Sequence, residues 1–161
     1  YTTFYEKYNE DEKVESTNIK INNKILHQSK LINYFKENNS IKNISKDLND
    51  LLKKVKNDKE YYISMKDIIL IESLRYDGIN ISKKYNKLYK VADYNMPNDI
   101  QVLINNNESG VVLLRLVEVI GQDRLKDIGS ETLYFIISAL NQLNMDPLRN
   151  KILLKVLPLK V

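Results

Sequence analysis

The only histidine, His27, is the first place to look for chemistry, because histidine exchanges protons most readily near neutral pH. Ser29 follows two residues later, so a serine nucleophile with a histidine base can be considered. Such a pair needs a third group that orients the imidazole, and no carboxylate lies nearby in the sequence, although distant acids could approach. We therefore expect His27 to have a structural or surface role.

The chain lacks the usual residues of a metal or cofactor site. It has no Cys and a single His, so carboxylates would have to supply almost every metal ligand. The glycines are scattered, and neither GxGxxG nor GxxxxGK[ST] occurs. The pair Asp77-Gly78 lacks the spacing of a calcium loop and predicts a helix end. We expect no metal, no cofactor and no catalytic residue.

Two charged residues interrupt the most apolar segment, residues 111–120 (VVLLRLVEVI). On a helix, Arg115 and Glu118 lie close enough to form an ion pair on a narrow polar stripe. A second interpretation is that they face a groove and contact a partner, since arginine is enriched at interface hot spots. For a partner we predict polar contacts and then apolar anchors from these residues: Arg115, Glu118, Arg149, Lys151, Leu159 and Val161.

Lysines alternate with tyrosines between residues 83 and 90 (KKYNKLYK). On a helix, Lys83, Lys87 and Lys90 share one face, where they could contact phosphates while nearby tyrosines stack on bases. The same pattern is typical of an amphipathic surface helix in a protein rich in Lys and Tyr, which is the interpretation we favour. Binding of nucleic acid or another anionic surface by these lysines is the alternative function.

Helical spacing of apolar residues dominates the elements that would position these side chains. Asp146 followed by Pro147 is the clearest helix start, because Asp can accept bonds from the first N–H groups and Pro has none to satisfy. Pro158 closes the same segment. The segments predicted to be helical are 29–38, 41–56, 65–76, 82–91, 99–104, 111–120, 130–143 and 146–157.

The N-terminal segment has a different pattern. Residues 1–17 show no sustained period, and Ile19 and Ile21 then alternate with polar residues before Asn22-Asn23, a pair that can form a two-residue turn. We predict a small β-hairpin near residues 17–26. The chain starts at Tyr1 rather than Met, so we expect a processed product or a fragment. The predicted organisation is a tail with the hairpin over 1–28 and a helical domain over 29–161.

The composition agrees with a folded helical domain. The 25 basic and 21 acidic residues are interspersed and leave a net charge of only +4, so there is no basic or acidic tail. The apolar runs are far shorter than the ~20 residues that span a bilayer. Residues 111–120 are apolar almost all round, which predicts that neighbours cover that helix on every side. We expect an all-α fold, a short α-solenoid-like stack of antiparallel helix pairs.

Residues 98–159 contain ESGVVLLRLVEVIGQDRL and then ETLYFIISALNQLNMDPLRNKILLKVLPL. This region resembles helical-repeat modules of the tetratricopeptide or HEAT kind, and looks most like the C-terminal helical region of a group of uncharacterised bacterial proteins. The resemblance implies stacked helix pairs that present a surface to partners. It brings no catalytic residue.

Together these patterns indicate a non-catalytic protein–protein interaction or scaffold module of a larger or processed bacterial protein. The partner would be another protein, or a second copy bound through an apolar C-terminal end formed by Leu157, Leu159 and Val161. An enzyme whose active site lies in upstream sequence is the least favoured interpretation.

Overall fold

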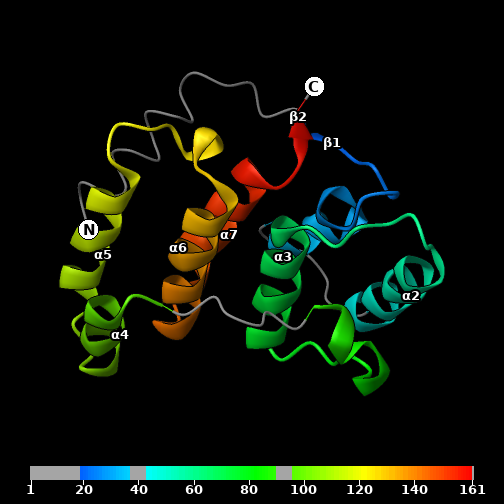
Figure 1. Cartoon of the computed structure of the whole chain (residues 1–161), viewed down its shortest axis with the longest axis horizontal. Helices are drawn as coiled ribbons and strands as arrows, with labels where there is room; N and C mark the ends of the chain where they lie inside the picture. The colour runs from blue at the N-terminus through cyan, green and yellow to red at the C-terminus, as the bar shows by residue number, and fades with distance from the viewer. Residues whose placement is uncertain (1–18, 37–42, 90–95, 161) are drawn as a thin grey trace.

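The computed structural model describes residues 19–36, 43–89 and 96–160, and this part of the chain is mostly helical (Figure 1). The coarse prediction of an all-α protein is therefore confirmed. Residues 159 and 160 are described by their backbone only. The α-helices are α2 (Ile44–Asn57), α3 (Met65–Tyr76), α4 (Asn98–Asn105), α5 (Ser109–Ile120), α6 (Ser130–Gln142) and α7 (Asp146–Val156). Short 3-10 helices are η1 (Leu26–Gln28), η2 (Lys30–Phe35), η3 (Lys83–Leu88) and η4 (Leu125–Asp127).

Helix α3 begins and ends where the sequence predicts, because both of its ends carry local signals. At the start, the Ser64 hydroxyl accepts from the Asp67 N–H at 3.2 Å, and the Asp67 carboxylate accepts from the Ser64 N–H at 3.1 Å. These two bonds form a capping box, which satisfies N–H groups that have no partner inside the helix. At the other end, Gly78 adopts a φ of +84°, which glycine tolerates better than other residues.

The other helix ends follow similar rules, with small shifts. Asn107 and Asn144 have φ of +58° and +55° just after α4 and α6, which is the left-handed conformation that asparagine tolerates. Gly121, after α5, has a φ of +62°. In α7, Asp146 is the first helical residue rather than the cap, and Pro147 follows it in the first turn.

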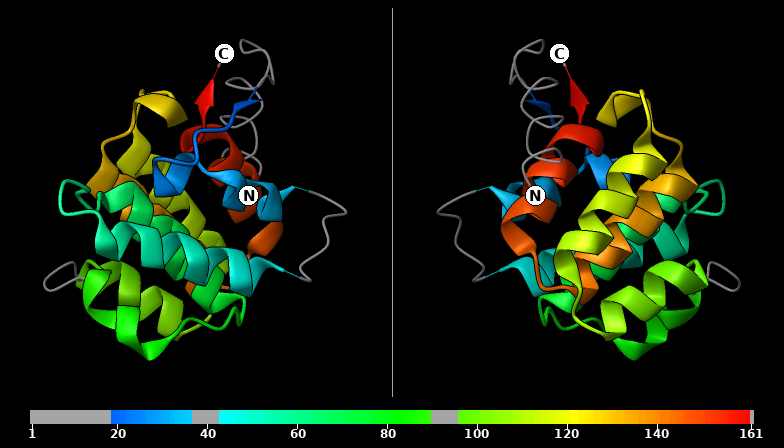
Figure 2. Two further views of the ribbon diagram at one scale, coloured as in Figure 1. Left: turned by 90° about the vertical axis from the view of Figure 1, so that its right-hand side faces the viewer. Right: turned by 90° about the vertical axis from the view of Figure 1, so that its left-hand side faces the viewer.

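Helix α6 lies at the centre of the described structure. It makes its most extensive contact with α3 and also packs on α4, α5 and α7 (Figures 1 and 2). In a repeat stack each unit contacts the next along the chain, whereas α3 contacts α6 across the intervening α4 and α5. The helical character is shown, but solenoid-like stacking is not confirmed.

A single hydrophobic core runs through these helices. Leu70 of α3, Leu113 of α5, Leu140 of α6 and Leu153 of α7 have no exposed surface and belong to the same cluster of buried side chains. Leu26 of η1, which falls in the predicted N-terminal tail, is also part of that cluster. None of the described helices is long and apolar enough to cross a membrane.

The predicted hairpin near residues 17–26 is wrong in its pairing, as far as the structure describes that segment. A strand is present at β1 (Ile19–Lys20), but it pairs antiparallel with β2 (Leu159–Lys160), with Ile19 opposite Lys160. Residues 23–28 form a turn and η1 instead of a returning strand. The alternation of Ile19 and Ile21 therefore signalled a strand, but it could not reveal a partner about 140 residues away in the chain.

Two of the predicted α-helices are 3-10 helices. Ser29 caps η2 as expected, with its hydroxyl 3.4 Å from the Leu31 N–H. Within residues 82–91, the described helix is η3, which ends at Leu88. Short connectors commonly adopt this tighter winding, which turns about 120° per residue instead of about 100°. The change matters for η3, because it alters which lysines share a face.

The position of α5 corrects the expectation that neighbours cover it on every side. The helix lies at the edge of the molecule (Figure 1), and Val111, Leu114 and Val119 are 44 %, 51 % and 47 % exposed. Val112, Leu113 and Leu116 on the opposite side are fully buried. One side of this apolar helix therefore meets solvent.

Candidate functional site: the outer face of α4 and α5

The exposed side of α5 follows the spacing of a single helical face. Its exposed residues lie at 111, 114, 115, 118 and 119, and α4 adds Asp99 and Val102 beside them. We call this surface the α4–α5 face and define it by seven residues: Asp99, Val102, Val111, Leu114, Arg115, Glu118 and Val119. Within the described residues, the exposed aliphatic side chains gather on this face, with Ile21 lying elsewhere.

A charged line crosses the α4–α5 face. The Arg115 guanidinium lies 2.5 Å from the Asp99 carboxylate of α4 and 2.7 Å from the Glu118 carboxylate one turn along α5. The predicted ion pair between Arg115 and Glu118 is thus confirmed. The hydrogen bond from Arg115 lowers the pKa of Asp99, and the bond to Asp99 raises the pKa of Arg115. The ion pairs hold the guanidinium at the centre of the face.

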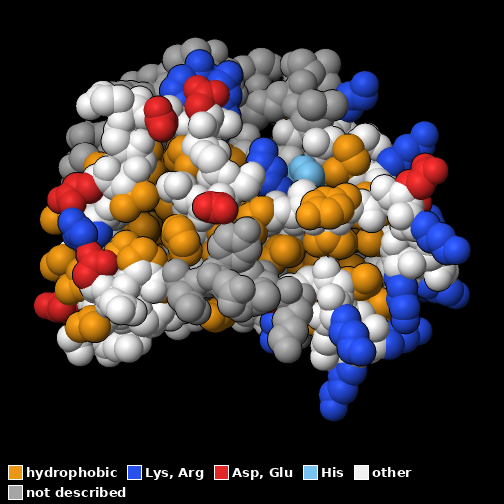
Figure 3. All heavy atoms as spheres, viewed as in Figure 1, with side chains coloured by type: hydrophobic (Ala, Val, Ile, Leu, Met, Phe, Trp, Pro, Cys, Tyr) orange, Lys and Arg blue, Asp and Glu red, His pale blue; other side chains and the backbone are white. Residues whose placement is uncertain are grey.

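The figures show the same arrangement. In Figure 3, red and blue side chains alternate with orange ones along the left edge, where Figure 1 places α4 and α5. The right-hand view of Figure 2 looks towards these two helices. The face therefore combines a fixed arginine, which offers charge and planar hydrogen bonds, with aliphatic groups that are in contact with water.

Arg149, a predicted partner contact, is inside the protein. Its side chain has no exposed surface, and its two terminal nitrogens bind the two Asp77 carboxylate oxygens at 2.8 and 2.7 Å. It also donates to the Asn141 side chain of α6 at 3.0 Å and lies 5.8 Å from the ring of Phe35. The prediction of a surface role is therefore corrected, because tertiary packing surrounds Arg149 with partners from α3, α6 and η2.

This buried cluster also perturbs a tyrosine. The Tyr34 hydroxyl donates to Asp77 at 3.0 Å. Burial, together with that hydrogen bond and the negative charge of Asp77, raises the pKa of Tyr34 to about 12. Asp77 is therefore bound from two directions, by a buried arginine and by a tyrosine that stays protonated. The arrangement stabilises the junction of α3 with α7 and η2.

Of the other contacts predicted at the C-terminus, one is buried, one is exposed, and two have side chains that the structure does not describe. Leu157, expected at an open apolar end, is only 2 % exposed and belongs to the core. Lys151 is exposed on α7. The backbone of Leu159 pairs in β2, but its side chain is not described, and Val161 lies outside the described residues. The exposed apolar surface therefore lies on α4 and α5. The described residues show no exposed apolar surface at the C-terminal end.

His27 does find a carboxylate, although not one near it in sequence. Its Nδ1 lies 2.7 Å from Asp67, and its backbone N–H donates to the same oxygen at 2.9 Å. The other Asp67 oxygen accepts from the Tyr61 hydroxyl at 2.8 Å and from the Ser64 N–H at 3.1 Å. Burial would raise the pKa of Asp67, but the bonds from His27, Ser64 and Tyr61 outweigh burial and lower it.

The His27 cluster does not have the geometry of a nucleophilic triad. In a triad, one imidazole nitrogen binds the carboxylate and the other binds the nucleophile. Here the Ser64 hydroxyl lies 3.4 Å from Nδ1, the nitrogen that already faces Asp67. Ser29, the serine considered from the sequence, donates its hydroxyl proton to the Leu26 carbonyl at 2.7 Å. The cluster is instead a polar junction that ties η1 to the start of α3.

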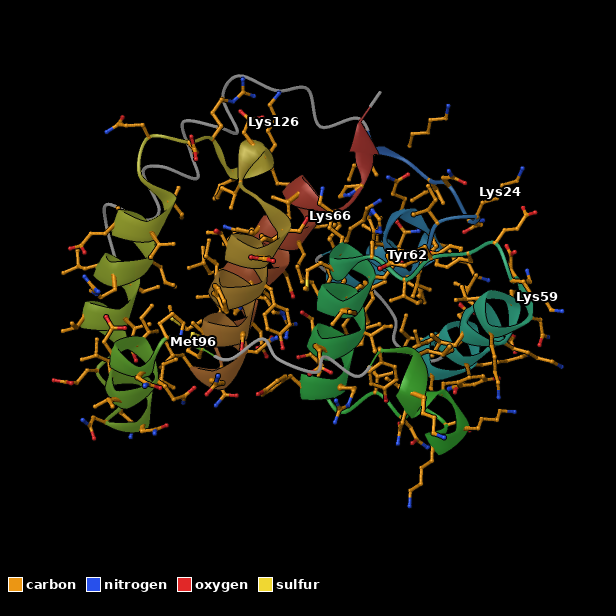
Figure 4. The ribbon with its side chains drawn as sticks, in the orientation of Figure 1. Lys24, Lys59, Tyr62, Lys66, Met96 and Lys126 are labelled. Atoms are coloured by element: carbon orange, nitrogen blue, oxygen red, sulfur yellow. The ribbon has the colours of Figure 1, made fainter. Side chains whose placement is uncertain are left out.

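The lysine segment differs from the predicted anion-binding face. In a 3-10 helix, residues three apart share a face, so Lys84 aligns with Lys87 while Lys83 does not. Lys90 lies outside the described residues. Tyr85 and Tyr89, expected to stack on bases, are only 2 % and 6 % exposed. Lysines do gather over α2 and η3 at the right and lower right of Figure 3, and Figure 4 shows Lys24 and Lys59 above them on the right-hand side.

No cluster of three or more His, Asp or Glu side chains within the described residues could hold a metal ion. Comparison with protein-family models, with curated proteins and with solved structures found no match. The site must therefore be interpreted from its own geometry.

Sequence reasoning found Arg115 and Glu118 but missed Asp99 and Val102 of the α4–α5 face. The signal that could have found the face is the spacing of the two charges. Arg115 and Glu118 mark the direction of α5 that faces water, and Val111, Leu114 and Val119 fall within that direction. Nothing in the sequence of α4 shows that Asp99 lies beside Arg115, because that contact depends on how the two helices pack.

Proposed function

We propose that this protein is a non-catalytic interaction module that binds a protein partner through the α4–α5 face. The observation that carries the proposal is the cluster of four exposed aliphatic side chains around the Asp99–Arg115–Glu118 line. Such side chains lose contact with water when a partner covers them, which favours association. The arginine would orient the partner through charge-assisted hydrogen bonds.

The C-terminal half of the chain contains two helix pairs that could support the α4–α5 face. Helices α4 and α5 contact each other, α6 and α7 contact each other, and α6 packs on both members of the first pair. We propose that these two successive pairs act as a short helical-repeat-like unit that supports the α4–α5 face, as the resemblance of residues 98–159 implies. Arg115 and Glu118 are retained as contact residues, whereas Arg149 is not.

An anionic partner is supported by one observation only, the gathering of lysines over α2 and η3. The burial of Tyr85 and Tyr89 removes the stacking contribution that single-stranded nucleic acid would need. Binding of this kind would rest on lysine charges alone and would weaken steeply with salt. We therefore keep it as the second candidate.

The proposed function predicts that α5 contacts a protein in the cell. A photo-cross-linking residue at Leu114, in the full chain and in its own cells, should form a covalent adduct with a protein. The same residue at Tyr62, which is 89 % exposed on a different surface, is the matched control and should give far less adduct. Adducts of equal yield at both positions, or no protein adduct at Leu114, would contradict the proposal.

A further inference from the structure

The α4–α5 face carries opposite charges side by side, an arrangement that can pair with a copy of itself. We infer that the partner bound by this face is a second copy of the same chain, related by a two-fold axis that passes between Arg115 and Glu118. The inference rests on the proposed function, since it names the occupant of the same face. In such an interface, if one residue contacts a second residue of the other copy, the same contact occurs again with the two copies exchanged.

Charge complementarity is the first argument. Arg115 and Glu118 are adjacent on α5 and are 44 % and 64 % exposed. A two-fold axis midway between them places each Arg115 opposite the other copy's Glu118. Asp99 binds Arg115 from α4, so the guanidinium stays paired and oriented when Glu118 turns towards the second copy. The guanidinium has enough donors for both carboxylates.

The aliphatic residues supply the second argument. Leu114 and Val119 lie on opposite sides of the charged pair on α5, with Val111 and Val102 beside them, and all four are at least 44 % exposed. The two-fold axis therefore brings an aliphatic surface from one copy against an aliphatic surface from the other. This produces an apolar contact with charges fixed at its centre, where they define the register and disfavour other pairings.

The size of the face sets the expected strength. With about 1.5 Å of rise per residue, the 12 residues of α5 extend about 18 Å and the 8 residues of α4 about 12 Å. At a helix width of about 10 Å, the outer sides of the two helices present roughly 300 Å². That surface is smaller than the ~800 Å² per partner of a standard interface. We therefore expect a dimer that dissociates on dilution through the micromolar range.

A similar pair elsewhere on the chain serves as a control. Glu72 and Arg75 of α3 form an ion pair of the same spacing, at 2.8 Å. Arg75 also lies 5.7 Å from the ring of Tyr89, and among the described residues no comparable group of exposed aliphatic side chains surrounds the pair. If exposed ion pairs alone produced association, this second pair would matter as much as the first.

The test is sedimentation velocity over a dilution series, on the full chain and on single charge reversals. Wild-type protein should form dimers that dissociate on dilution. Arg115→Glu and Glu118→Arg should each raise the dimer dissociation constant at least about tenfold, because like charges then meet across the axis. An equimolar mixture of the two variants should restore association to within about threefold, since opposite charges meet again. Arg75→Glu should leave the dimer dissociation constant unchanged.

Several results would overturn the inference. They are a wild-type chain that stays monomeric at about 100 μM, reversals that leave the dimer intact, and a mixture of the variants that does not recover. Circular dichroism of each variant shows whether it is folded. If Arg115→Glu fails to fold, Leu114→Asn replaces it and should weaken the dimer without adding charge.

The outcomes separate this inference from the proposed function. A monomeric chain whose Leu114 cross-links to a different protein in cells refutes the second copy but supports an interaction face. A monomeric chain without any cross-link at Leu114 refutes both. A dimer that depends on Arg115 and Glu118, with Leu114 cross-linked to a second copy, supports both.

Discussion

Two arginines of this chain pair with an aspartate from another part of the fold, and their surroundings give them different roles. Arg149 binds Asp77 with no exposed surface, at the junction of α3, α6 and α7. Arg115 binds Asp99 at the edge of the molecule with its side chain 44 % exposed. The ion pairs are alike in length, at 2.7 and 2.5 Å. The difference lies in solvent, which screens the second pair and not the first.

The comparison shows why residue type alone did not predict a site. Both arginines were candidates for partner contact, because arginine is common at hot spots. A buried arginine must satisfy its donors internally, and Arg149 does so with Asp77, Asn141 and Asn150. Indeed, within the described residues no buried side-chain nitrogen or oxygen lacks a hydrogen-bond partner. Only Arg115 keeps a surface that a partner could reach.

The largest expected effect comes from breaking the inner pair. Arg149→Ala leaves Asp77, whose side chain is only 12 % exposed, without its bidentate partner, and losing one member of a buried pair costs about 3–5 kcal/mol of folding free energy. The free energy of unfolding, measured by urea denaturation followed with circular dichroism, should fall by that amount. Arg149→Lys should lose less, because it keeps the charge but not the planar fork.

The matched control for Arg149 is Arg75→Ala on α3. Arg75 is half-exposed and pairs with Glu72, so its removal should change the free energy of unfolding by no more than about 1 kcal/mol. If Arg149→Ala were as mild as this control, Arg149 would not hold the junction of α3 with α7.

A second, smaller effect is expected at the polar junction of His27 and Asp67. Asp67→Asn removes a charge that accepts four hydrogen bonds in a buried position, and we expect a loss of about 1–3 kcal/mol at pH 7. Ser64→Ala is the control, because it keeps the Asp67 carboxylate. It removes the cap bond to the Asp67 N–H and the long 3.4 Å contact with His27 Nδ1, and it should cost about 1 kcal/mol.

The pH dependence of the Asp67 effect has a defined sign. The pKa of Asp67 is lower in the folded protein than in the unfolded chain, so the folded state binds fewer protons at this group. Its contribution is therefore fully present above the unfolded pKa, which is about 3.9, and is lost as the pH falls through the folded pKa. Urea denaturation at a series of pH values should show wild type and Asp67→Asn converging below about pH 4. Curves that stay parallel would contradict this assignment.

The sequence predicted what depends on neighbours along the chain and missed what depends on packing. The ends of α3 follow from Ser64, Asp67 and Gly78, which act within one turn of the helix. The pairing of β1 with β2 and the contact of His27 with Asp67 join distant residues, and no local pattern identifies such partners. The outward face of α5 was predictable only in part. The charges at 115 and 118 indicated which side meets water, but the many aliphatic residues of the helix predicted burial on every side.

The smallest effect on folding is expected at the outer pair, and it sharpens the comparison most. Arg115→Ala removes exposed ion pairs that solvent screens, so the melting temperature should change by no more than about 2 °C. The same substitution should weaken association through the α4–α5 face in sedimentation experiments, since it removes the central charge. Arg149→Ala should show the opposite profile, with unfolding made easier and dimer formation unchanged where the protein remains folded. If Arg115→Ala instead lowered the melting temperature as much as Arg149→Ala does, Arg115 would serve to join α4 to α5, and its exposure would not indicate a contact surface.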